Sequence, residues 1–459
     1  MRKSFLTCLL ILIAAMTLKS EPAVIYGRVI NGQGLTVRLM TFGDQVSYLR
    51  ETLESQVIGE DEKFSISVAI DTVIYCWLDI EFQQADLFIQ PGQTYEMEIN
   101  LVQGAASASY FNRTGLVYTV IRDDDDRLNS SIQDFNQLYN DFLLNYAQKP
   151  GTSASRNAFN NFRTAIDLRF QNATHPFFLD YLKYKTASME LFLRIRGQET
   201  VGMEYISGQP VLYDHPEYMD FFHLYFEKYF LTGSKYFNYN KTYDLVNGVS
   251  SVYDILDSLQ IDPVLNDPDV RELLLLDGLK ELYQVSGFKR NRIIAMLTEL
   301  SKNGNSPQSQ SIACNLLTRL NRLQPGTPAP PFTLPEIATG KEYSLADFTG
   351  KPVYLAFFDS GNPACKTELR LIRDIYETYR DKMAFIAISV DKDRKALSDY
   401  ISGAGLPWLV LHYEGNIDLL EQYDATTYPY FVLINEKGWI ARCPAPNPSE
   451  NLERLFHSF

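Results

Sequence analysis

"GKPVYLAFFDSGNPACKTELRLIRDIYETYR", residues 350–380, is the stretch that decides the fold of the C-terminal part of this chain. The apolar run "VYLAFF" is typical of a buried strand, and an amphipathic helical pattern begins after "NP". Asn is a favoured N-cap residue and Pro a favoured first helical residue, so the helix is predicted to begin at Asn362 and Pro363. The stretch therefore predicts a strand–turn–helix unit with Cys365 in its first helical turn.

Further strands and helices alternate on the C-terminal side of this unit. "MAFIAISVD" and "LPWLVLHY" predict two more strands, each followed by a helical pattern, and "YFVLIN" and "WIARC" predict a hairpin around the turn "EKG". A βαβ unit followed by a hairpin and a helix predicts a small mixed sheet with helices on both faces. The Pro-rich segment "QPGTPAPPFTLPE" precedes these elements, which places the α/β domain at residues 325–459.

Two segments of this domain resemble a known family. "GKPVYLAFFDSGNPACKTEL" looks like the active-site segment of TlpA-like / AhpC-TSA-type thioredoxin-fold proteins, and "YDATTYPYFVLINEKGWI" looks like their later segment. The resemblance implies a thioredoxin fold, with a cis peptide bond between Tyr428 and Pro429 beside the redox site. The order of β-rich, helical and thioredoxin-like parts also resembles exported proteins of Bacteroidota. The family's activity is thiol–disulfide exchange.

The motif of this chain departs from that family at the redox site. The family's C-x-x-C falls on the sequence N-P-A-C, so Asn362 stands at the position of the nucleophilic Cys and Cys365 at that of the resolving Cys. The buried Asp that thioredoxins use for proton transfer falls on Ala356. Exchange needs a thiolate that attacks a disulfide and a second thiol that resolves the mixed disulfide. An amide cannot attack, so the motif is degenerate.

Two functions are compatible with this motif, and the sequence leaves both open. In the first, the domain exchanges no disulfides and binds a protein or peptide partner in a groove beside the motif. In the second, Cys365 acts as a monothiol in disulfide exchange or peroxidase-like chemistry, which requires an accessible thiol of lowered pKa. A buried, structural Cys365 is expected under the first function. The predicted groove residues are Phe358, Asn362, Tyr428 and Pro429.

The residues upstream of this domain divide into two regions. Residues 21–104 contain short β-branched and aromatic runs separated by turns such as "NGQG" and "QPGQ", which predicts a β-sandwich-like module. Residues 105–324 have apolar side chains at helical spacing, which predicts a mainly α-helical domain whose many aromatic residues form its core. The run Asp123–Asp126 lacks the spacing and the Gly of a calcium loop and is expected to be a solvated turn.

The first twenty residues have the pattern of a cleavable secretory signal. Arg2 and Lys3 precede an apolar run from Phe5 to Met16, which is shorter than the ~20 residues of a membrane span. Residues 1–20 are therefore predicted to be removed on export to the periplasm, with association to the cell envelope as the alternative. No transmembrane segment is expected after cleavage.

Composition and charge exclude several kinds of partner. The chain has 459 residues, of which 46% are hydrophobic and 21% charged, as in an ordinary globular protein. Its net charge of −14 and its lack of a basic block argue against binding nucleic acid. No zinc-ligand spacing and no nucleotide-binding motif occurs, so neither a metal nor a cofactor is predicted. The sequence leaves open the oligomeric state and the pairing of Cys76, Cys314 and Cys443.

Overall fold

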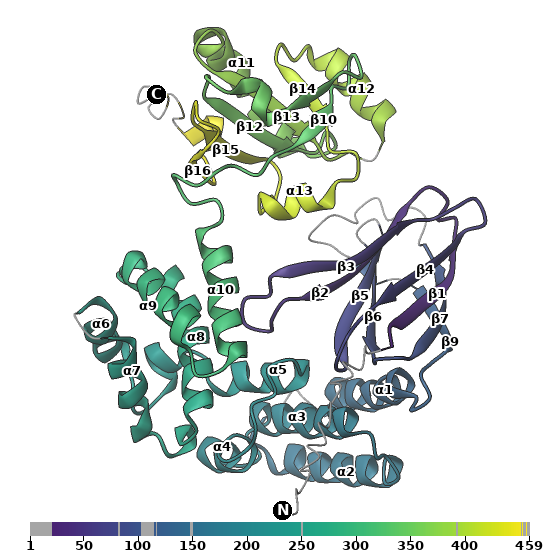
Figure 1. Cartoon of the computed structure of the whole chain (residues 1–459), viewed down its shortest axis with the longest axis vertical. Helices are drawn as coiled ribbons and strands as arrows, with labels where there is room; N and C mark the ends of the chain where they lie inside the picture. The colour runs from purple at the N-terminus through teal and green to yellow at the C-terminus, as the bar shows by residue number, and fades with distance from the viewer. Residues whose placement is uncertain are drawn as a thin grey trace, which may run out of the picture.

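The computed structural model shows a β-rich N-terminal module, a helical middle and a C-terminal thioredoxin-like domain (Figure 1), which confirms the predicted fold class. It describes residues 21–80, 83–101, 114–115, 117–146, 150–248, 251–391 and 393–450, together with residues 452 and 456. The predicted signal, residues 1–20, lies outside the described residues. Within the described ranges, no helix combines the length and the hydropathy needed to cross a membrane.

Two sheets pack face to face in the N-terminal module. Their strand orders are β4-β1-β7-β9 and β3-β2-β5-β6-β8, and one apolar core lies between them. On β7, alternate residues are fully buried, as expected of a strand with one face in a core. β9 pairs with β7, so the sandwich continues past residue 104 to Arg122. The strands are β1 Ala23–Ile30, β2 Thr36–Phe42, β3 Arg50–Val57, β4 Lys63–Val68, β5 Ile74–Ile80, β6 Gln83–Ile89, β7 Thr94–Asn100, β8 Thr114–Gly115 and β9 Val117–Arg122.

Helices α1 to α10 form the middle of the chain, and their aromatic residues lie in its cores as predicted. Pro stands at the start of α3, α5, α8 and α10, where its missing N–H leaves no helical hydrogen bond unmade. The helices are α1 Leu128–Tyr146, α2 Ser153–Arg169, α3 Pro176–Phe192, α4 Gln198–Tyr205, α5 Pro216–Tyr225, α6 Tyr239–Asn247, α7 Val252–Ser258, α8 Pro268–Gln284, α9 Arg290–Asn303 and α10 Pro307–Asn321.

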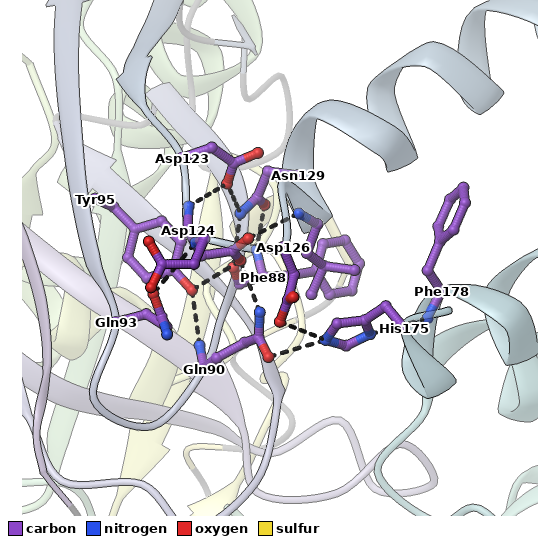
Figure 2. A network of polar contacts seen from close by, with 12 residues as sticks. Phe88, Gln90, Gln93, Tyr95, Asp123, Asp124, Asp126, Asn129, His175 and Phe178 are labelled. Atoms are coloured by element: carbon purple, nitrogen blue, oxygen red, sulfur yellow. Dashed lines mark hydrogen bonds and ion pairs between the residues drawn. The ribbon is translucent and has the colours of Figure 1, made fainter. Parts of the chain in front are cut away.

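The acidic run before α1 joins the sandwich to the helices (Figure 2). Its prediction as a solvated turn agrees with Asp125 and Asp126, which lie exposed in a turn, and is wrong for Asp124. Asp124 is only 4% exposed. Its carboxylate accepts hydrogen bonds from the Leu128 N–H at 2.9 Å, from the Gln90 amide at 2.9 Å and from the Tyr95 hydroxyl at 3.2 Å. The N–H groups in the first turn of a helix need such acceptors, so α1 begins where this carboxylate is held by the sandwich.

The same polar network reaches α3 (Figure 2). The Asn129 side chain both donates to and accepts from the backbone of Phe88, at 2.8 Å in each case. His175 caps α3 by accepting from the Phe178 N–H at 3.4 Å, and its Nε2 lies 2.9 Å from Oε1 of Gln90. The sandwich and the first helices are therefore linked by side-chain hydrogen bonds as well as by apolar packing.

The C-terminal domain has a mixed sheet of order β14-β13-β12-β15-β16. β12, β13 and β14 are parallel, while β15 runs antiparallel to β12 and to β16. All six residues of β12 are buried because side chains cover both faces of the sheet. The elements are β10 Thr333–Pro335, β11 Glu342–Ser344, β12 Val353–Phe358, α11 Pro363–Tyr379, β13 Ala384–Ser389, α12 Arg394–Ala404, β14 Leu409–His412, α13 Ile417–Gln422, β15 Tyr430–Ile434 and β16 Ile440–Arg442.

Helix α13 joins the C-terminal domain to the β2–β3 hairpin of the sandwich (Figure 1). Arg38 is almost fully buried and pairs with Asp79 of its own module at 3.3 Å and with Asp418 of α13. Arg50 on β3 pairs with Glu421 of α13 at 2.6 Å. Two arginines of the sandwich thus hold two carboxylates of the thioredoxin-like domain.

Candidate functional site

Asn362 caps the helix that carries the N-P-A-C motif, as predicted. Its Oδ1 accepts a hydrogen bond from the Ala364 N–H at 2.8 Å, and Pro363 follows as the first helical residue. Its Nδ2 donates to the Tyr428 carbonyl at 3.0 Å. The amide therefore fixes the start of α11 and joins it to the loop before β15.

That loop contains the predicted cis proline. The Tyr428–Pro429 peptide bond is cis, as the family resemblance implies, and Cys443–Pro444 is a second cis bond, which the sequence does not predict. Both Tyr428 and Pro429 are half-buried, as is Asn362. The structure therefore brings three of the four predicted groove residues together at one surface.

Phe358 does not lie at this surface. It is the last residue of β12, has 0% exposure and packs in the same core cluster as Cys365 and Leu369. The prediction that Phe358 lines a groove is therefore wrong. β12 is the central strand, and α11 covers the face to which this ring points.

Cys365 is a buried thiol. It has 0% exposure, and burial raises its pKa to about 11, with the charges of Asp359 and Asp391 acting in the same direction. A position in the first turn of a helix stabilises a thiolate. Here the loss of solvation outweighs that effect, because the sulfur faces the sheet.

Asp391 is a site residue that the sequence analysis missed. It follows β13 and accepts hydrogen bonds from the Ser360 N–H at 3.1 Å and from the hydroxyls of Ser360 and Ser389. It thus holds the turn that leads into Asn362. The sequence "SVD" places Asp391 directly after a predicted strand. Because β12 and β13 are parallel, their carboxyl ends lie at the same edge of the sheet, so a polar residue there is a candidate for the site.

The four cysteines of the described residues are free, and none of them forms a disulfide there. Cys443 is half-buried, with its sulfur 3.2 Å from the Tyr430 hydroxyl, and it packs on the opposite face of the sheet from Cys365. Cys76 is buried in the sandwich and Cys314 is exposed on α10. In the part of the chain that the structure describes, no group of three His, Cys, Asp or Glu residues is placed to hold a metal ion.

Alkylation against pH is expected to show that Cys365 is inert in the folded protein. With a pKa of about 11, only about one thiol in a thousand is ionised at pH 8, and the sulfur is shielded as well. Exposed Cys314 should be labelled within minutes under conditions that leave Cys365 unlabelled, and unfolding should make the two equal. Mass spectrometry of labelled peptides, with Cys365→Ser as the control, measures both rates. Fast labelling of Cys365 with a midpoint below ~8.5 contradicts this expectation.

The C-terminal domain is similar to known proteins. Residues 324–452 match the family model described as Redoxin. The thiol-disulfide oxidoreductase ResA of Bacillus subtilis (strain 168) is 26% identical over 128 residues, which are 28% of this chain and 70% of that protein. The thioredoxin-like protein YneN of the same organism is 29% identical over 121 residues, 26% of this chain and 69% of that protein.

Solved structures also match this chain. The thioredoxin domain of a thiol-disulfide oxidoreductase from Bacteroides vulgatus is 22% identical, with a TM-score of 0.28, and the match covers 29% of this chain and 97% of that domain. A thiol:disulfide interchange protein from Bacteroides sp. is 24% identical, with a TM-score of 0.28, over 30% of this chain and 91% of that protein. The sandwich and the helical middle lie outside the residues that the family model matches.

Proposed function

Because residues 324–452 match the Redoxin family and Asn362 stands at the nucleophile position, we propose an exported protein that binds a polypeptide partner and exchanges no disulfides. One combined observation carries this proposal: the N-cap position holds Asn362, which has no thiol, and the thiol of Cys365 is fully buried. ResA, one of the relatives named above, is a thiol-disulfide oxidoreductase, and dithiol exchange requires an attacking thiol, for which this chain has Asn362.

The surface that would bind the partner lies where α11 begins. Pro363 and Ala364 are exposed in the first turn of that helix, and the half-buried Tyr428 and Pro429 lie beside them. The ring of Tyr428, the two prolines and the methyl group of Ala364 form an apolar patch next to the polar Asn362. A polypeptide with an apolar side chain fits this patch, and the signal pattern of residues 1–20 supports a periplasmic encounter, with the cell envelope as the alternative.

The monothiol alternative lacks support from the site. For Cys365 to attack a disulfide or a peroxide, its sulfur would have to lose a proton and reach solvent. Burial opposes both, since it raises the pKa of the thiol to about 11 and leaves the side chain 0% exposed.

Insulin reduction and peptide binding together test the proposed function. The purified protein should reduce insulin in the presence of dithiothreitol no faster than dithiothreitol alone. In a peptide-library screen, peptides with apolar side chains should bind, and Tyr428→Ala should weaken their binding about tenfold, as expected for the loss of a ring at the centre of an interface.

Tyr343→Ala is the matched control, because Tyr343 is also half-buried in this domain but lies on β11 and packs against one core cluster alone, whereas Tyr428 packs against the clusters on both faces of the sheet. It should leave peptide affinity unchanged. Insulin reduction that disappears in Cys365→Ser would show a working monothiol and contradict the proposal. Peptide binding that is equally insensitive to both tyrosine substitutions would show that the partner surface lies elsewhere.

A further inference from the structure

A cavity of about 450 Å³ lies between the sandwich and the helices, outside the family-matched domain. Its walls come from β5, β6 and β9 on one side and from α1, α3 and α5 on the other. Four of its rings belong to Tyr75, Phe88, Tyr118 and Tyr181. The ring centroids of Tyr75 and Phe88 are 5.5 Å apart, and those of Phe88 and Tyr181 are 6.0 Å apart, so these three rings form a continuous wall.

The charges that face this cavity have one sign. Asp86, Glu217 and Asp220 line it, whereas no Lys, Arg or His does so among the described residues. Asp86 is exposed where it lines the cavity. The surrounding rings still displace part of its hydration water, and this desolvation raises the pKa of its carboxyl group. Its Oδ1 accepts from the Tyr75 hydroxyl at 2.9 Å, and within the described residues its Oδ2 accepts no hydrogen bond.

The protein's own side chains show how such a wall holds a cation. The ammonium of Lys185 donates to Glu217 at 2.9 Å and lies 6.0 Å from the ring centre of Tyr181 and 5.3 Å from that of Tyr139. Carboxylate and aromatic faces together are a favourable environment for an organic cation. The Asp86 side of the cavity has the same two components, without a cation of the described chain between them.

We propose that this cavity binds an organic cation, with its alkylammonium or guanidinium group at Asp86 and its carbon chain against the surrounding rings. A bare metal ion fits less well, because rings are not metal ligands and the described carboxylates do not group into a metal site. The cation can be a free amine or a Lys or Arg side chain of a partner polypeptide. Both share the chemistry that the cavity recognises.

Calorimetric titration of the purified protein with agmatine and with the peptide acetyl-Gly-Arg-Gly-amide tests this proposal. Agmatine carries a guanidinium and an ammonium group, and the peptide carries a guanidinium on a backbone. Asp86→Asn is expected to weaken binding at least tenfold, and binding is expected to weaken with added salt. Asp220→Asn should weaken cation binding severalfold. Asp220 is exposed and its side chain makes no hydrogen bond within the described residues, so this substitution breaks none of the wall's hydrogen bonds.

Asp399→Asn is the matched control, since Asp399 is an exposed carboxylate on α12 in another domain. It should leave the affinity unchanged. Binding of agmatine alone assigns the cavity to free amines, and binding of the peptide assigns it to a side chain of a partner. Binding of neither probe, or equal affinities in the Asp86→Asn and Asp399→Asn variants, overturns the proposal. Because Asp220→Asn preserves the hydrogen bonds of the cavity wall, the test stands even if Asp86→Asn does not fold.

Discussion

Asn362→Cys is expected to raise insulin reduction from the background rate by about two orders of magnitude or more, because it supplies the thiolate that exchange requires. The N-cap and the third helical residue lie side by side, so the new thiol faces Cys365. It attacks a substrate disulfide and releases one substrate thiol. Cys365 then attacks the sulfur at position 362 in the mixed disulfide, which releases the second substrate thiol and forms a disulfide between positions 362 and 365. The substrate gains two electrons, and dithiothreitol returns the site to the dithiol form.

The same substitution removes a helix cap. Asn362 accepts from the Ala364 N–H and donates to the Tyr428 carbonyl, so its loss should cost about 1 kcal/mol of stability. Asn362→Ser, which keeps a capping oxygen without a thiol, controls for this cost and should remain inactive. Adding Cys365→Ser to Asn362→Cys should abolish turnover. A folded Asn362→Cys variant that still fails to reduce insulin would show that N-P-A-C does not correspond to the family's C-x-x-C.

Asp124→Asn is expected to lower the free energy of unfolding by about 3 kcal/mol, as a buried carboxylate with three donors loses its charge and gains an unwanted donor. Its two oxygens accept from the Leu128 N–H, the Gln90 amide and the Tyr95 hydroxyl. The amide has one acceptor oxygen, so at least one buried donor loses its partner. Urea unfolding followed by circular dichroism measures the difference.

Asp125→Asn is the matched control for this prediction. Asp125 is the next residue in the acidic run, is exposed and makes no side-chain hydrogen bond in the described ranges. Its substitution removes the same charge and should change the free energy of unfolding by less than about 0.5 kcal/mol. An equal loss of stability in the two variants would mean that the negative charge before the N-terminus of α1, and not the burial of Asp124, governs the stability of this junction.

The sequence predicts those features that depend on neighbouring residues. Asn362 and Pro363 predict the start of α11, and the apolar run of β12 predicts a central strand. The turn-separated runs of residues 21–104 predict strands, as observed. In each case local propensity and burial point in the same direction, so the pattern is sufficient.

Features that join distant segments could not be predicted in the same way. Asp124 is buried because Gln90 and Tyr95 of the sandwich approach it, and the sequence of an acidic run carries no sign of such partners. The place of Phe358 in the motif predicts a surface position, but α11 covers β12 and therefore buries its ring. The cavity at Asp86 is lined by residues of both the sandwich and the helices, so no single segment of the sequence predicts it.

The arginine at position 38 also bears on the order in which the domains of the chain assemble. Domains generally fold as units. The first partner of Arg38, Asp79, is synthesised soon after it, whereas Asp418 follows 380 residues later. The sandwich can therefore close early with its buried guanidinium already neutralised. Helix α13, one of the last elements of the chain, then docks on a sandwich that is already folded.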